Sequence, residues 1–363
     1  MSQHSVYFQE ESKDFKGLTK ELQLRCQKYF AENQLSSKDN GLLISKLALA
    51  MILFMTSWTL IFFTPVHWSI KLLCLVGFAL SSFTFVLGVG HDALHNAISH
   101  SGQANQFILN LCANMVGFYP PYWKARHTTH HRYVNIPGYD YDIESISFIR
   151  LSEHRSWSYI HKWQHLYAPF FYGLFTLHWQ LSKDFETYFL NKGPRSELLL
   201  IVIQKCVYFG VLLGIPLAFG SLTWSETLLY FFIAQYLFGF CLALTLALAH
   251  INPQSEIVYP REGKISHSYH RHQIITGVDF KATSKLYCFL FGGFNAHIAH
   301  HLFPGVCSIH YPALSQMIQE VVDQYKIEYF NLSFTDMTLS HLRQLKGLGE
   351  SSQVQLKESL STQ

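Results

Sequence analysis

Four long stretches of apolar residues dominate the hydrophobic pattern of the chain. They cover about residues 43–63, 69–90, 197–219 and 224–249, and each is close to the roughly 20 apolar residues that cross a bilayer as a helix. Only the short segments TPVHW and GSLT separate the two members of each pair. The pattern therefore predicts two transmembrane helical hairpins.

Shorter apolar stretches lie near residues 105–118, 166–180 and 284–296. They are too short to cross a bilayer comfortably, so we expect interfacial or re-entrant helices there. The polar segment after Glu350, SSQVQLKESLSTQ, is predicted to be disordered because it has few residues that a core would bury. The sequence thus divides into an N-terminal segment (1–42), a membrane domain (43–315) and a C-terminal segment (316–363).

Lys and Arg are concentrated in the segments before, between and after the two predicted hairpins. Residues 1–42 hold six Lys or Arg, residues 91–196 nine and residues 250–363 nine, which is 24 of the 27 in the chain. The two hairpin turns hold none. By the positive-inside rule, both termini and the central segment are expected to face the cytoplasm.

The composition supports a membrane protein and excludes some partners. Hydrophobic residues make up 49% and charged residues only 14% of the chain, against about a quarter charged in typical soluble domains. A net charge of +3, without a concentrated basic run, argues against a nucleic-acid partner. Seven scattered cysteines without a CxxC pair favour a reducing compartment. The polar, acid-containing N-terminus is not typical of a cleaved signal peptide.

Histidine is abundant, with 21 residues, and eight of these fall into three clusters. HDALH begins at the end of the second apolar stretch, and HTTHH and HIAHH lie in segments predicted to share its side of the membrane; their histidines are His91, His95, His127, His130, His131, His297, His300 and His301. On a helix, residues four apart share a face. His250 closes the fourth apolar stretch and is expected at the same membrane face, as an interfacial histidine or a ninth ligand.

Eight or nine imidazoles are too many for one ion and suit two. Imidazole is a ligand for iron, zinc and copper. A zincin would need HExxH and a ferritin-type di-iron site would need ExxH pairs, and the sequence has neither. A pair of redox metals beside a membrane suits activation of O2 towards an unactivated C–H bond of a lipid-like chain. The alternative of a different class is a non-catalytic metal-binding or transport protein.

The clusters resemble the histidine boxes of the membrane fatty acid desaturases, HxxxH, HxxHH and [HQ]xxHH, over about residues 80–315. The segments YWKARHTTHHRYVNIPGYDYDIE and FGGFNAHIAHHLFPGVCSIHYPAL are similar to acyl-CoA and acyl-lipid desaturases related to front-end enzymes. The resemblance implies an all-α integral membrane protein with a cytoplasmic helical cap. It also implies that the eight box histidines bind two iron ions, and His250 matches the extra histidine that follows the last transmembrane helix in stearoyl-CoA-type enzymes.

The resemblance implies that the chain introduces a cis double bond into an acyl chain linked to CoA, a carrier protein or a lipid. The membrane lipids that surround the protein are expected partners as well. A related hydroxylase, acetylenase or ketolase would use the same ligands. The third box reads HIAHH where many front-end relatives have QIEHH, so the double-bond position is left open. No HPGG haem motif occurs; we expect electrons from a separate ferredoxin or cytochrome b5, and a bacterial inner membrane.

Further residues are predicted beside the metals or along a substrate tunnel. Aspartates in GYDYDIE are suited to orienting ligand histidines, although a Pro-Gly turn would also favour aspartates there. The HQIITGVDF segment, which begins at the last histidine of the uneven run SHSYHRH, resembles a family segment. The residues concerned are Asp140, Asp142, Asn135, Trp123, Asn295 and His272.

Overall fold

Two hairpins of long helices form one side of the protein. The computed structural model describes residues 6–38, 41–143 and 148–361. Four helices in it are long and apolar enough to cross a membrane: Gly41–Phe62, Trp68–Leu94, Arg195–Phe219 and Trp224–His250. Each lies within a few residues of a predicted stretch, which confirms the prediction of an all-α membrane protein with four spanning helices. The orientation of the termini stays a prediction.

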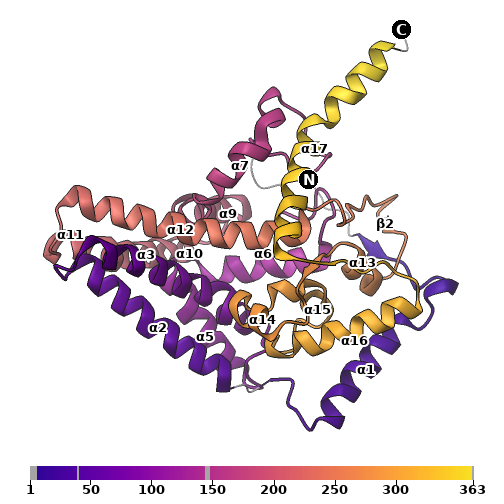
Figure 1. Cartoon of the computed structure of the whole chain (residues 1–363), viewed down its shortest axis with the longest axis horizontal. Coiled ribbons are helices and arrows are strands. Elements are labelled where there is room, and N and C mark those ends of the chain that lie inside the picture. The colour runs from indigo at the N-terminus through magenta and orange to yellow at the C-terminus, as the bar shows by residue number, and fades with distance from the viewer. Residues whose placement is uncertain (1–5, 39–40, 144–147, 362–363) are drawn as a thin grey trace.

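The hairpins pack against each other through α3 (Trp68–Phe83) and α12 (Trp224–His250), while α2 (Gly41–Phe62) packs on α3 within the first hairpin. The three helices run side by side in Figure 1. Within the first hairpin, the buried rings of Phe54 on α2 and Phe78 on α3 lie 4.5 Å apart between ring centres. Apolar side chains on the opposite faces are exposed, as in Leu49 and Leu73. These exposed faces are the surface expected of helices surrounded by lipid.

Two of the long helices contain a π-helical segment. Beyond α3, the second span continues through η2 (Thr84–Gly90) into the short α4 (His91–Leu94). The third span consists of α10 (Arg195–Phe209), η5 (Gly210–Gly214) and α11 (Ile215–Phe219). π-Segments shift the register of a helix and recur at functional sites. Because His91 directly follows η2, this shift sets the side of the helix to which His91 points.

Shorter helices connect the hairpins and cover one end of them. The predicted interfacial segments fall on α5, α7 to α8 and α14, each too short to span a bilayer. The bounds of the connecting elements are α5 (Gly102–Met115), α6 (Pro120–Tyr133), η3 (Tyr159–Trp163), α7 (Gln164–Tyr172), α8 (Phe175–His178), η4 (Trp179–Lys183) and α9 (Asp184–Asn191).

The rest of the cap follows α12, joined by the N-terminal segment. Helix α1 packs on α16 through the buried residues Leu18, Leu22 and Ile318 (Figure 1). Two parallel strand pairs, β1 with β2 and β3 with β4, tie distant segments together. The bounds are β1 (Tyr7–Phe8), η1 (Lys13–Phe15), α1 (Leu18–Glu32), β2 (Lys264–Ile265), α13 (Tyr269–Ile275), β3 (Asp279–Phe280), α14 (Lys285–Phe291), η6 (Phe294–Ala296), α15 (His297–Leu302), η7 (Ser308–His310), α16 (Tyr311–Gln324), β4 (Asn331–Leu332) and α17 (Phe334–Ser361).

Helix α17 differs from what the sequence predicts. It extends to Ser361 and so includes the polar segment after Glu350 for which we expected disorder. That segment contains neither Gly nor Pro, so no residue in it terminates a helix. Its final turns project from the body of the protein (Figure 1).

Candidate metal centre

Nine histidine side chains from four parts of the chain meet where the cap covers the hairpins. They form two groups, and within each group one ring nitrogen from every histidine lies within 4.8 Å of the others. The first group is His91, His95, His127, His131 and His300, and the second is His130, His250, His297 and His301. These are the nine histidines that the sequence analysis singled out.

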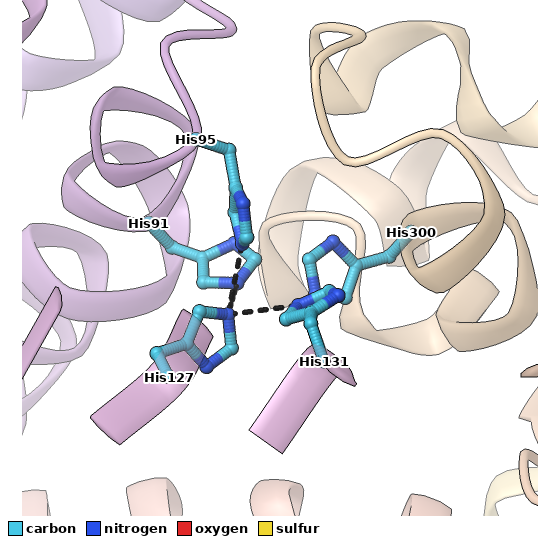
Figure 2. A group of neighbouring side chains, drawn as sticks. All are labelled: His91, His95, His127, His131 and His300. Carbon is cyan, nitrogen blue, oxygen red and sulfur yellow. Dashed lines mark hydrogen bonds between the residues drawn. The ribbon is translucent and has the colours of Figure 1, made fainter. Parts of the chain in front are cut away.

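The first group is drawn in Figure 2, where imidazoles from the second span, α6 and α15 point toward one another. His127 Nε2 lies 2.8 Å from His91 Nε2, 2.9 Å from His95 Nε2 and 3.0 Å from His131 Nε2. Imidazole nitrogens sit roughly 2.0–2.1 Å from a zinc ion, and two such ligands at a right angle are therefore about 3 Å apart. The spacing of these nitrogens is that of ligands around one ion.

The second group has the same geometry. His250 Nε2 lies 3.1 Å from His130 Nε2 and 2.6 Å from His297 Nε2. The rings of His297 and His301 are 4.5 Å apart between their centres. All members of this group are buried, whereas His95 and His127 of the first group are partly exposed.

Each HxxHH motif contributes to both groups, and helical geometry explains how. In α6, His127 and His131 are four residues apart and point to the first group, while His130 points to the second. In α15 the pattern is reversed: His297 and His301 belong to the second group and His300 to the first. Residues four apart lie about 40° apart around a helix, whereas the fourth and fifth positions of the motif are about 100° apart.

Burial keeps these imidazoles neutral, which is the form that binds metal. Burial, reinforced by His95, holds the pKa of His127 well below its ordinary value. Burial and neighbouring histidines likewise hold the pKa values of His297 and His300 well below the ordinary range. The exception is His130: burial lowers its pKa, but the charge of Asp140 offsets this, so the pKa stands above its ordinary value.

Asp140 contacts the outer nitrogen of His130. Both of its carboxylate oxygens lie 3.1 Å from His130 Nδ1, and Asp140 is fully buried. The carboxylate also accepts hydrogen bonds from the backbone N–H groups of Asn135 and Asp142, both at 2.9 Å. Asp142 itself lies farther away, 3.5 Å from His130 Nδ1, and pairs with Arg126.

Two further contacts to histidines of these groups were not anticipated from the sequence. His301 Nδ1 donates to the side-chain oxygen of Gln273 at 2.8 Å, and Gln273 also donates to the backbone carbonyl of His131 at 3.2 Å. The Tyr311 hydroxyl lies 3.5 Å from His300 Nδ1. Gln273 directly follows His272, the residue of this segment that the sequence points to, so the resemblance locates the segment but not the side chain that makes these contacts.

The other predicted residues lie around the centre in different roles. His272 is outside both groups: its Nε2 donates to the carbonyl of Val134 at 2.8 Å. Asn135 is buried with a φ of 52° and donates to Ser255 Oγ at 2.7 Å and to the carbonyl of His250 at 3.3 Å. Asn295 donates to the carbonyl of Lys281 at 3.0 Å.

A cavity of about 550 Å³ borders the two groups, which is within the range of small-molecule sites. His127, His130, His250 and His297 lie in its wall, and most of the remaining wall is apolar, including Phe171 and Ala247.

A smaller cavity of about 50 Å³ shares His127 and Phe294 with the large one and is lined by His91 and Trp123. The histidine groups therefore stand where the two cavities adjoin.

The residues present fit a pair of metal ions. In the described part of the chain, the Nε2 atoms of His300 and His301 are buried without a hydrogen-bond partner, which is costly unless another partner is bound. Their outer nitrogens already face Tyr311 and Gln273. Nine imidazoles without a thiolate suit iron, copper or zinc.

Comparison with known proteins shows which family and which enzymes this chain is similar to. The family described as fatty acid desaturase matches residues 66–333. The sn-1 linoleoyl-lipid 6-desaturase of Synechocystis sp. is 30% identical over 93% of this chain and 97% of its own length. An enzyme of the same name from Arthrospira platensis is 28% identical over 86% of this chain and 87% of its length. The acyl-lipid (8-3)-desaturase of Physcomitrium patens is 26% identical over 94% of this chain and 73% of its length.

Proposed function

Because the chain belongs to the fatty acid desaturase family, we propose that it introduces a cis double bond into the acyl chain of a membrane lipid, with two iron ions held by nine histidines. The fatty acyl desaturase activity follows from the family and its relatives. The ligand set, the iron count and the lipid carrier are the proposal's additions. The observation that carries them is the division of nine histidines into groups of five and four beside an apolar cavity.

The protein's residues perform three tasks in this reaction. Bound iron supplies the redox chemistry that lets O2 remove hydrogen from unactivated C–H bonds. The histidines hold the ions, and Asp140 and Gln273 orient His130 and His301 from behind, as outer partners of metal ligands do. The apolar wall of the cavity holds the acyl chain against the centre and excludes water from it.

A lipid-linked substrate is supported by the relatives and by the surface of α7. The relatives above carry names of lipid-linked desaturases. Leu166 and Phe170 of α7 are exposed by 66% and 60%, while Phe171 and Tyr172 of the same helix line the large cavity. Helix α7 thus separates the cavity from a surface that suits the membrane interface, from which a lipid can enter without leaving the bilayer.

The remaining parts of the proposal concern electrons and location. A separate electron-transfer protein, a ferredoxin or a cytochrome b5, delivers two electrons for each double bond. The charge distribution of the sequence supports a cytoplasmic position for both termini and the centre. The proposed location is a bacterial inner membrane.

The test is expression in a host with few native unsaturated lipids, followed by fatty-acid analysis of separated lipid classes. We expect a new cis double bond that appears first in glycerolipids, and locating it fixes the position. Iron analysis of purified protein should give two ions per chain, and a His130→Ala variant should lose both iron and product. A new double bond appearing first in the acyl-CoA pool would refute the lipid carrier, and a hydroxylated product alone would refute desaturation.

A further inference from the structure

Helix α17 lies beyond the residues matched by the family, which end at 333, yet it contacts the wall of the large cavity. His341 on α17 is fully buried. Its Nδ1 lies 2.7 Å from the carbonyl oxygen of Ile251, and its Nε2 lies 2.8 Å from the hydroxyl of Tyr172. Tyr172 lines the large cavity, and so does Ile251. One side chain from outside the matched region therefore joins two parts of this wall.

These two contacts define the hydrogen-bond directions. A carbonyl oxygen only accepts, so Nδ1 carries the hydrogen and Nε2 accepts from the Tyr172 hydroxyl. Burial lowers the pKa of His341 to about 4, which keeps this neutral form at physiological pH. The Tyr172 hydroxyl is thereby hydrogen-bonded to His341. Without that partner, the hydroxyl would be a buried polar group in an apolar wall, which is unfavourable.

Neighbouring bonds make α17 a rigid support for this contact. Ser340 Oγ donates to Asn252 Oδ1 at 2.8 Å, in the segment that follows His250. Gln164 at the start of α7 donates to the carbonyl of Leu345 at 2.7 Å. Helix α17 is thus bonded both to the helix that carries Tyr172 and to the segment that follows a proposed iron ligand.

We propose that His341 is a positioning residue that sets the place of Tyr172 in the wall and, through it, where the acyl chain lies relative to the two histidine groups. This inference rests on the proposed function. The carbon that faces the metals depends on how far the chain advances along the cavity, so a displaced Tyr172 changes the double-bond position or the preferred chain length. Metal binding is unaffected, because His341 contacts none of the nine histidines.

The test compares His341→Phe, which retains a ring but neither hydrogen bond, with His341→Gln, whose amide can donate to Ile251 and accept from Tyr172. We expect His341→Phe to keep the wild-type iron content, to raise KM for the acyl lipid about tenfold, as loss of a bond worth about 1.4 kcal/mol would, and to shift the product positions or chain lengths. His341→Gln should restore most of the wild-type distribution. Tyr172→Phe should reproduce the shift, and the double variant should add little to it.

The matched control is His310→Phe. His310 is also buried and its Nδ1 lies 3.4 Å from a tyrosine hydroxyl, that of Tyr29, in the cap, and it lines neither cavity. Its substitution should leave the product distribution unchanged. The positioning role is refuted if His341→Phe keeps the wild-type KM and products, or if its activity falls only in proportion to iron. A wild-type chain that forms no double bond would instead refute the function on which the inference rests.

Discussion

Replacing Asp140 by Asn tests whether the centre depends on a charge behind one ligand. The fully buried carboxylate contacts His130 Nδ1 with both oxygens and accepts two backbone N–H groups. An amide has only one oxygen, so its NH2 group must face the backbone N–H of Asn135 or of Asp142, donor against donor. The substitution therefore removes the charge and also leaves one buried N–H unpaired.

The structure sets the size of the effect. A hydrogen bond to a charged group contributes about 1.5–3 kcal/mol, and loss of an outer partner typically lowers metal affinity or activity about 10- to 100-fold. The loss should fall first on the group of four histidines that contains His130. We therefore expect Asp140→Asn to retain about one iron per chain where the wild type retains two.

The assay measures iron per chain after dialysis against a weak chelator, together with double bonds formed in the expression host. Asp142→Asn is the matched control, because Asp142 has a side chain 40% exposed and lies farther from His130; its effect should be several-fold smaller. Melting in detergent identifies variants that fail to fold. Equal iron retention and equal product for Asp140→Asn and the wild type would refute the proposed role of the charge.

Three other predictions follow from the same geometry. His131→Ala should abolish product and lower iron content, whereas His272→Ala, outside both groups, should keep its iron; loss of iron in both would contradict the ligand assignment. Ala247→Phe fills part of the large cavity and should reduce product at unchanged iron content, and full activity would place the acyl chain elsewhere. Lys205 pairs with Asp184 in the protein interior, so Lys205→Met leaves the Asp184 charge buried and unpaired and should destabilise the fold by about 3–5 kcal/mol. Adding Asp184→Asn should raise the melting temperature again. A double variant that melts no higher than Lys205→Met would show that the unpaired charge is not the cause of the destabilisation.

Local pattern was sufficient for the spans and for selecting the nine histidines that the structure brings together. A span is defined by consecutive apolar residues, and the helical period alone puts His127 and His131 on one face. His250 was identified because the end of an apolar stretch can be placed relative to the end of another. Each of these inferences uses residues close in sequence, and the structure places the elements accordingly.

The division of the histidines into groups of five and four was decided by the tertiary structure. His130 and His250 are 120 residues apart in sequence, and nothing in HTTHH shows that His130 joins one histidine group and His131 the other. That choice depends on how α6 and α15 are rotated against each other, which many contacts determine together.

The same reason hid Gln273 and His341. A glutamine and a lone histidine carry no motif, and each becomes informative only through a partner, His301 in one case and Tyr172 in the other. Their hydrogen bonds connect residues 28 and 169 positions apart. Periodicity along the chain specifies which side chains share a face, whereas the packing of whole elements decides what that face meets.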